Sequence, residues 1–574
     1  MKFLMKYLKP FLGRMSAGVS IKIFGTLVEL MIPYILSHIL ENVVVTQDIR
    51  LIIFWGVMML LCAAVACVCN IVANRMAARV SRNFSERVRH DLFSRTMRLS
   101  SAQVDAFTIP SLESRITTDT YNVHNFVGMM QRMGVRAPIL LAGGIAITLF
   151  MDSYLALAMI AILPFIFITV YFISRRGVPL YSKVQKSSDK MIRVVREDTQ
   201  GIRVIKALSK ADYERRRYDK VNNDLSRDEQ KAGIIMGSVN PIMTLLMNVG
   251  LVIVVALSAS RVAGHQSSPS TVIAFMQYFT QISMAMMSVT RIFTMYTKCS
   301  ASARRIAEVI EAPEDLTVKS ETEFPRKENG AHIEFSNVSF SYKGKHNDLE
   351  NISFSLPRGG TLGIIGATGS GKSTLIRLLM RFYDVNKGAV YIGGRDVRTI
   401  PAEELYPMFG ATFQHDFLYA DTVKENIDLG RNLSDEEIVS AAKIAQAHDF
   451  ISAFPDKYSH MLSQKATNIS GGQKQRLLIS RAIAAHPEIL VLDDSSSALD
   501  YKTDANLRAA LRENMSGTTV ITVAQRVSSV KDSDLILVLD EGKVIGMGKH
   551  EDLLETCAEY REISESQMGG AFVE

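Results

Sequence analysis

The sequence predicts an α-helical membrane domain with six transmembrane helices, fused to an α/β domain of about 240 residues. The first observation is a series of apolar stretches of membrane-spanning length that ends near residue 296. The second is a change of composition after about residue 300, where β-branched strands with Gly turns replace the apolar stretches. We therefore expect a transmembrane domain over 1–305, a linker over 306–330 and a second domain over 331–574.

Composition limits the classes of protein to consider. The chain has 574 residues, 48% of them hydrophobic, with 28 Met, so several domains and a membrane region are expected. The net charge of +7 is explained by membrane topology, because no aromatic-rich RNA motif or zinc-finger spacing accompanies it. We expect a lipid bilayer as surroundings and no nucleic acid as partner.

Six stretches have the length that a bilayer requires. They cover about 16–41, 51–73, 132–151, 153–174, 235–259 and 271–296. An even number of spans places both termini on one side, and the basic start "MKFLMKYLKPFLGRM" places that side in the cytoplasm. Basic, helical sequence also predicts two long intracellular hairpins, one between the second and third spans and one over about 175–234.

One ionisable residue lies in the middle of the first span. Burying the carboxylate of Glu29 in a membrane is expensive, so it predicts either a polar partner or a water-filled cavity.

The strongest motif of the second domain is "GATGSGKST", in which Gly366, Gly371, Lys372 and Ser373 fit the phosphate-loop pattern. It follows a predicted strand and precedes a predicted helix, as the motif requires. Backbone N–H groups of such a loop surround phosphates, the Lys reaches the β and γ oxygens, and the Ser is a ligand of Mg²⁺. ATP and Mg²⁺ are therefore the expected ligands. The residues of this loop taken to bind ATP are Gly366, Thr368, Gly369, Gly371, Lys372, Ser373 and Thr374.

Two further motifs lie downstream of the phosphate loop. "EILVLDD" is an apolar strand ending in Asp493, whose carboxylate is placed to hold the water shell of Mg²⁺. "NISGGQKQR" has a Ser and two glycines before a probable helix, which is a second anion-binding arrangement without a Lys of its own.

Together, in this order and spacing, the motifs resemble the nucleotide-binding domain of ABC transporters. The resemblance implies that Tyr342 stacks on adenine and that Gln414 senses the γ-phosphate and joins Ser373 and Asp493 at Mg²⁺. It also implies that the signature Ile469, Ser470, Gly471, Gly472 and Gln473 completes the ATP site of a partner chain, and that Ser497, Ala498, Leu499 and Asp500 form the D-loop. "SLESRITTDTYNV" and "TQGIRVIKAL" resemble the coupling segments of ABC exporters, so the whole chain looks like an exporter half-transporter.

The sequence departs from the family pattern twice at its own phosphate loop. Asp494 stands where the family has a catalytic Glu, and Gln525 stands where it has a switch His. The shorter carboxylate lies about 1.5 Å farther from the attacking water, whereas a general base needs contact near 3 Å. Gln525 cannot carry a proton, although its amide can still donate a hydrogen bond. The pair predicts a site that binds ATP and hydrolyses it slowly.

This pattern resembles the degenerate-site chain of heterodimeric ABC multidrug exporters. It implies a non-identical partner that carries the catalytic Glu and His, and ATP-driven efflux of a small, amphipathic or lipophilic substrate across the cell membrane. Hydrolysis would then occur mainly at the partner's site, which the intact signature completes. Two alternatives are a slow homodimeric exporter, in which Asp494 works as the base, and a nucleotide-gated membrane regulator without transport.

Overall fold

The computed structural model describes residues 2–264, 268–327, 330–342, 344, 346–414 and 416–568. The expected linker 306–330, the expected loop between the last two spans and the end of the second domain each include residues outside these ranges. The chain divides into two compact units, which are described separately. The first contains Met1–Arg98 and Thr108–Ala312, and the second contains Leu99–Phe107 and Pro313–Glu574.

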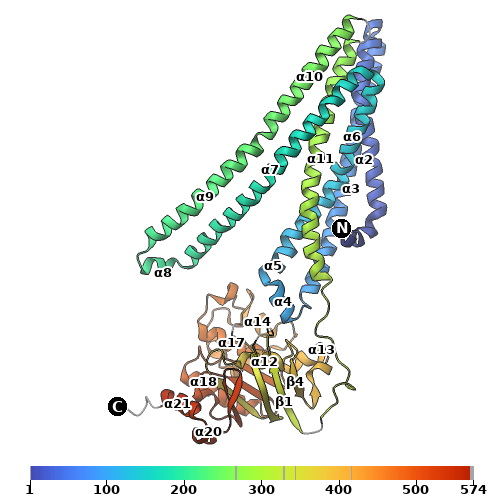
Figure 1. The fold of residues 1–574 in the computed structure, drawn as a ribbon. Coiled ribbons are helices and arrows are strands. Elements are labelled where there is room, and N and C mark those ends of the chain that lie inside the picture. The colour runs from blue at the N-terminus through green and yellow to red at the C-terminus, as the bar shows by residue number, and fades with distance from the viewer. Residues whose placement is uncertain are drawn as a thin grey trace. The chain divides into compact units, whose positions relative to one another are not determined.

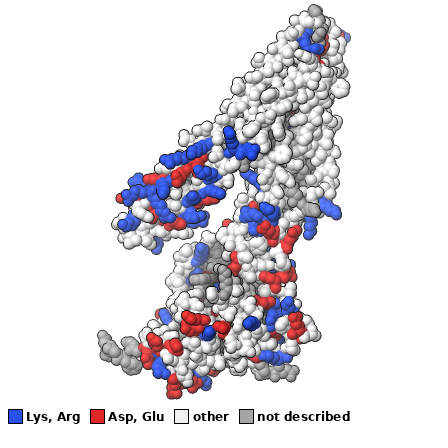
Figure 2. All heavy atoms as spheres, in the orientation of Figure 1, with Lys and Arg blue, Asp and Glu red and all other residues white. Residues whose placement is uncertain are grey.

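The described residues of the first unit form helices joined by short turns, and they confirm the six predicted spans. Within the described residues, six helical segments are long and apolar enough to cross a membrane. The helices are α1 (Lys2–Leu8), α2 (Leu12–His38), α3 (Ile49–Thr96), α5 (Ile109–Ser114), α6 (Thr120–Met151), α7 (Ser153–Gln200), α8 (Ile202–Ala207), α9 (Ala211–Gly237), α10 (Val239–Ala263) and α11 (Pro269–Ile310). Along the apolar part of this unit few charged side chains reach the surface, whereas many gather on α7, α8 and α9 (Figure 2).

The two long helical extensions that the sequence predicts are present. Helix α3 continues without a break from its apolar part to Thr96. Helices α7 and α9 run side by side as a long hairpin that α8 closes (Figure 1). The tight turn between the third and fourth spans is Asp152, which caps α7 by accepting hydrogen bonds from the N–H groups of Tyr154 and Leu155 at 3.0 and 3.3 Å. The same carboxylate pairs with Arg261 of α10.

Close helix contacts form the core of this unit. Tyr278 of α11 is fully buried and donates a hydrogen bond to the backbone oxygen of Leu30 at 2.6 Å. A Cβ on Gly143 of α6 would lie 2.6 Å from Cδ1 of Leu30, so a larger residue there would displace the Leu30 side chain.

The predicted polar partner of Glu29 is Arg136. Its guanidinium NH2 lies 2.5 Å from Oε1 of Glu29, across the contact between α2 and α6. The second oxygen, Oε2, and Nε of Arg136 are buried without a hydrogen-bond partner among the described residues. The pair is thus only partly satisfied, and losing either member leaves a charge between apolar helices.

We expect Glu29→Ala to lower the thermal stability of the purified chain, by on the order of 1 kcal/mol, because Arg136 loses its counter-charge. Glu29→Ala combined with Arg136→Ala should recover part of the loss, and Glu86→Ala on the exposed part of α3 serves as the control. The unfolding temperature in detergent measures all four proteins. A double variant less stable than Glu29→Ala would contradict the pairing.

The second unit is an α/β domain with two sheets. The four-stranded antiparallel sheet has the order β2-β1-β4-β5, and the six-stranded sheet has the order β10-β9-β3-β8-β7-β6, in which β3, β6, β7, β8 and β9 are parallel. The strands are β1 (Ala331–Phe340), β2 (Leu349–Pro357), β3 (Thr361–Gly366), β4 (Lys387–Ile392), β5 (Arg395–Asp396), β6 (Phe409–Thr412), β7 (Ile489–Asp493), β8 (Thr519–Val523), β9 (Leu535–Asp540) and β10 (Lys543–Gly548). The helices are α4 (Ser101–Phe107), α12 (Lys372–Leu379), α13 (Ala402–Leu405), α14 (Val423–Asp428), α15 (Asp435–Ile444), α16 (His448–Ser452), α17 (Gly471–Ile483), α18 (Tyr501–Asn514), α19 (Val527–Val530), α20 (His550–Thr556) and α21 (Ala558–Met568).

One short helix from the middle of the chain belongs to this unit. Helix α4 is held by the hydroxyl of Tyr383, which donates to Asp105 at 2.6 Å, and by Gln103, which donates to the backbone oxygen of Pro313 at 2.6 Å. The predicted coupling segment "SLESRITTDTYNV" begins a few residues later and lies in the helical unit. Sequence reasoning did not indicate α4, because no Gly or Pro between 96 and 101 marks the turn before it.

A buried histidine makes the second unit sensitive to acid. His332 of β1 is 6% exposed, and its Nδ1 lies 2.7 Å from the hydroxyl of Thr519. Burial, assisted by the charge of Arg358, lowers the pKa of His332 below its ordinary 6.5, against the opposite effect of Glu488. Because the unfolded chain then takes up the proton at a higher pH than the folded chain, stability falls as pH drops below about 6.5.

His332→Asn should therefore reduce the loss of thermal stability between pH 7.5 and pH 5.5. Scanning calorimetry of the intact chain at both values measures the difference, and His486→Asn is the control because that imidazole is 71% exposed. An unchanged pH dependence in His332→Asn would show that other groups dominate it.

Candidate nucleotide-binding site

Four parallel strands end at one edge of the six-stranded sheet and supply the predicted site residues. The phosphate loop follows β3, Gln414 follows β6, Asp493 ends β7 and Gln525 follows β8. Because β3, β8, β7 and β6 are consecutive neighbours, their carboxyl ends meet, which is where α/β sheets bind ligands. The sheet order thus brings together segments that lie up to about 150 residues apart.

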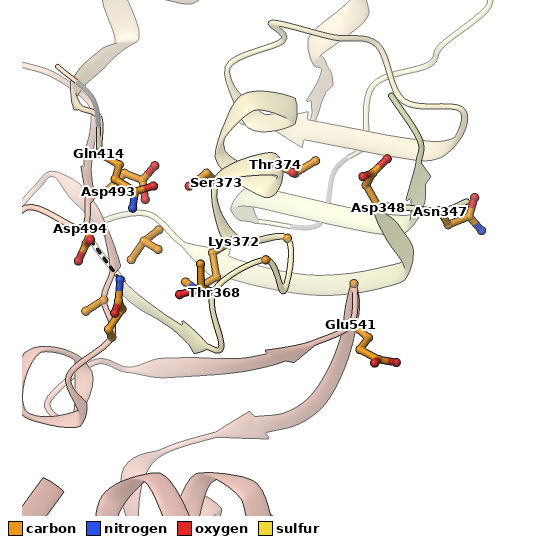
Figure 3. Close-up of a pocket in the computed structure, with 16 residues that line it drawn as sticks. Asn347, Asp348, Thr368, Lys372, Ser373, Thr374, Gln414, Asp493, Asp494 and Glu541 are labelled. Carbon is orange, nitrogen blue, oxygen red and sulfur yellow. Dashed lines mark hydrogen bonds between the residues drawn. The ribbon is translucent and has the colours of Figure 1, made fainter. Parts of the chain in front are cut away.

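These residues line one cavity of about 370 Å³. All of the residues predicted at this chain's own ATP and metal site line it except Tyr342 and Gly366. Figure 3 shows the labelled Gln414, Asp493 and Asp494 on one side and Lys372, Ser373 and Thr368 facing them. The cavity also takes in Asn347, Asp348, Glu541 and Gly542, which sequence reasoning missed because these loop residues belong to no motif.

The loop itself requires glycine at two positions. Gly371 has φ +100°, and a Cβ there would lie 2.6 Å from Cδ2 of Leu349. At Gly366 a Cβ would lie 2.1 Å from the backbone oxygen of Leu539 on β9. The loop therefore folds tightly against its own sheet, and α12 begins directly after it at Lys372.

The ammonium of Lys372 lies inside the loop. Its Nζ donates to the backbone oxygens of Gly366 and Ala367 at 2.9 and 2.7 Å. Burial lowers the pKa of Lys372, while Asp493 and Asp494 act in the opposite direction. The ammonium and the loop of backbone N–H groups are suited to bind polyphosphate.

The two carboxylates at the end of β7 differ in their surroundings. Asp493 is 4% exposed, and burial raises its pKa although Ser373 donates a hydrogen bond to it. A buried carboxylate beside a hydroxyl and the amide oxygen of Gln414 forms a set of hard oxygen ligands, so these residues fit Mg²⁺.

Asp494 adopts a left-handed conformation with φ +53°. Its Oδ2 accepts a hydrogen bond from Nε2 of Gln525 at 3.3 Å, the dashed contact in Figure 3. Burial raises the pKa of Asp494, and Lys372 opposes this. The two residues that depart from the family pattern are thus bonded to each other at the cavity wall.

Tyr342 lies beside the cavity without lining it. Its hydroxyl is 3.3 Å from Oγ1 of Thr374 and accepts a hydrogen bond from Arg377 at 3.1 Å. The rings of Tyr342 and Tyr383 lie edge to face, with their centroids 5.0 Å apart. Tyr342 therefore sits next to the last residue of the phosphate loop, and Arg377 is a neighbour that no motif indicated.

The signature and the D-loop lie outside this cavity and contact each other. A Cβ on Gly472 would lie 3.1 Å from the backbone oxygen of Ala498. Ser470 and Gly471 are exposed. Ser470 caps α17, accepting from the N–H of Gln473 at 3.2 Å, while the side chain of Gln473 accepts from the N–H of Ser470 at 2.9 Å. The chain thus presents an ordered helix start on its surface.

Fold and site together define a membrane-spanning protein with a phosphate-loop nucleotide site. Residues 15–286 match the family described as ABC transporter transmembrane region, and residues 349–497 match the family described as ABC transporter. The Bacillus subtilis (strain 168) protein named "Uncharacterized ABC transporter ATP-binding protein YfiB" is 34% identical over 569 residues, 98% of each chain. The similarly named MT1311 of Mycobacterium tuberculosis (strain CDC 1551 / Oshkosh) is 32% identical over 575 residues, 99% of this chain and 98% of its own.

The chain belongs to the ABC transporter family. Its fold is that of an exporter half-transporter: the solved structure of a bacterial Atm1-family ABC exporter with ATP bound matches with a TM-score of 0.82 at 23% identity, over 98% of each chain. Half-transporters of this type are multi-pass membrane proteins that dimerise, bind ATP and hydrolyse it.

Proposed function

We propose that this chain is one half of a heterodimeric ABC exporter and supplies its slowly hydrolysing ATP site. The observation that carries this proposal is the Asp494–Gln525 pair in an otherwise complete phosphate-binding cavity. The partner is a non-identical half-transporter with Glu and His at the equivalent positions. Both termini of this chain are cytoplasmic. Its transmembrane domain covers 1–305, its linker 306–330 and its nucleotide-binding domain 331–574.

The roles of the residues follow from their chemistry. Lys372 and the loop from Gly366 to Thr374 hold the phosphates of ATP, and Tyr342 stacks on the base. Ser373, Gln414 and Asp493 hold Mg²⁺, which neutralises phosphate charge when bound. Asp494 is too short to act as an efficient base, and Gln525 donates a hydrogen bond without moving a proton.

The exposed signature supports the second half of the proposal. Ile469–Gln473 and Ser497–Asp500 contact the ATP held by the partner, so that the two chains hydrolyse ATP chiefly at the site the partner's phosphate loop builds. Closure of the two nucleotide domains on ATP shifts the transmembrane helices between states of different substrate access. The exported molecules are small and amphipathic or lipophilic.

The test is purification of the tagged chain from its own cell membrane in mild detergent, followed by identification of what co-purifies. We expect one non-identical ABC half-transporter in equal amount, with Glu and His at the aligned positions. ATPase activity should be low for this chain alone and high for the pair. A tagged chain that pairs only with untagged copies of itself and loses its ATP turnover in Asp494→Ala would favour the homodimer alternative. Binding of ATP without substrate-stimulated turnover in the pair would favour a regulator.

A further inference from the structure

The last described helix, α21, contacts the segment that carries Gln525. Oε1 of Gln567 accepts a hydrogen bond from the N–H of Val527 at 2.8 Å, and its Nε2 donates to the backbone oxygen of Gln525 at 2.8 Å. One amide therefore holds the backbone on both sides of Arg526. The donor and acceptor that it meets fix which way round the amide lies.

Gln567 caps the first turn of α19, which has no cap from the neighbouring sequence. Val527 is the first residue of α19, and Arg526, which precedes it, makes no capping hydrogen bond with its side chain. The first N–H groups of a helix have no partner within the helix. Gln567 thus supplies from another helix the cap that the local sequence lacks.

Helix α21 is itself anchored where it meets the sheet. Tyr560 is fully buried in a cluster with Val527, Val530 and Cys557, and its hydroxyl lies 2.7 Å from Nδ1 of His550. Gln567 lies two turns beyond this anchor, on the exposed part of α21. We call the two hydrogen bonds of Gln567 to the backbone of Gln525 and Val527 the clamp. Helix α21 is thus buried at Tyr560 and exposed to solvent at Gln567.

We propose that Gln567 is a positioning residue that holds the Gln525 segment, so that α21 controls how the amide of Gln525 meets the terminal phosphate of ATP. The inference rests on the proposed function, because it takes the cavity at Lys372 as the ATP site. With the clamp closed, the side chain of Gln525 stays at the cavity wall beside Asp494. Without the two hydrogen bonds of Gln567, the backbone turn between β8 and α19 is held less firmly, and the side-chain amide of Gln525 loses its fixed direction.

This role predicts an effect on ATP and not on ADP. Only ATP carries the phosphate that Gln525 reaches, whereas the loop around Lys372 holds both nucleotides. Gln567→Ala should reduce the preference of the intact chain for ATP over ADP by about three- to tenfold, the usual effect of one lost hydrogen bond. Gln567→Glu, which accepts from Val527 but cannot donate to Gln525, should behave like Gln567→Ala.

The experiment measures binding of fluorescent ATP and ADP analogues, with Mg²⁺, to the purified full-length chain. Ser566→Ala, on the neighbouring exposed position of α21, is the matched control. A double-mutant cycle with Gln525→Ala tests the route: Gln567→Ala should have no further effect once Gln525 is gone. Equal losses of ATP and ADP affinity in Gln567→Ala, or an unchanged ratio, would overturn the clamp.

Lys372→Ala separates the two proposals. If ATP binding does not depend on Lys372, the proposed nucleotide site fails and the clamp fails with it. If binding depends on Lys372 and Gln567→Ala leaves the ratio unchanged, the site stands and only the clamp is wrong.

Discussion

Asp494→Glu combined with Gln525→His should turn the site of this chain into a hydrolysing one. The longer carboxylate reaches the attacking water, and the imidazole adds a group that can exchange a proton, so we expect turnover at this site to rise by about a hundredfold. In the structure, Nε2 of Gln525 donates to Oδ2 of Asp494, so one of the two carboxylate oxygens already has a hydrogen-bond partner. Asp494→Glu alone and Gln525→His alone each restore only one of the two groups, so each single variant should raise the turnover rate less than the double variant does.

The rate has to be assigned to the correct site. It is measured in the complex with a partner whose own catalytic Glu is changed to Gln, so that the remaining hydrolysis belongs to this chain. Adding Lys372→Ala to the double variant should return the rate to background. Because position 494 is left-handed, where Asp is tolerated better than Glu, the unfolding temperature is measured in parallel. A brisk rate in the unmodified chain, abolished by Asp494→Ala, would show that Asp494 already works as the base.

Ser470→Ala should have the opposite effect, on the complex with an unmodified partner. If Ser470 completes the partner's site, its loss removes a donor aimed at the phosphate, and ATPase activity should fall by about a hundredfold. Binding of ATP at Lys372 of the same chain should be retained. The two variants thus report on different sites although both change one chain.

A capping box elsewhere in the same domain provides the control for Ser470→Ala. Ser434 caps α15 and Glu437 completes the box, with the same backbone contacts that Ser470 and Gln473 make at α17. Each loss of a cap costs about 1 kcal/mol of stability. Ser434→Ala should therefore destabilise the domain as much as Ser470→Ala does and leave turnover intact. Equal loss of turnover in both variants would mean that Ser470 acts only through folding.

The sequence was sufficient for the architecture because its signals are local and strong. Six apolar stretches and a phosphate loop between a strand and a helix define elements without long-range information, and the structure contains them. Asp152 was recognisable as a turn because a single acidic residue separates two apolar runs. The order of residues within the phosphate loop and at the end of the strand before Asp493 also predicted which motif residues share the ATP site.

What the sequence did not provide depends on contacts between distant segments. Asp348 and Glu541 line the cavity only because the sheet order brings their loops to its edge. The partner of Glu29 was expected as a kind of residue, but nothing in a single sequence pairs it with Arg136. Gln567 lies 40 residues from Val527, in a helix without a motif. Helix α4 was not indicated by the sequence, because its attachment to the second unit is made through Tyr383 and Pro313, far along the chain.

Helix α4 also constrains how the protein is made. Asp105 and Tyr383, which bond to each other, are 278 positions apart, so at ordinary translation speeds α4 leaves the ribosome roughly 15–55 s before its partner exists. During that interval the later apolar helices are being inserted and α4 waits without its binding surface. A C-terminal product on its own therefore lacks the two hydrogen bonds that α4 makes to Tyr383 and Pro313. A fragment beginning at Pro313 would lack α4, which a complete domain obtains only from a chain synthesised from its beginning.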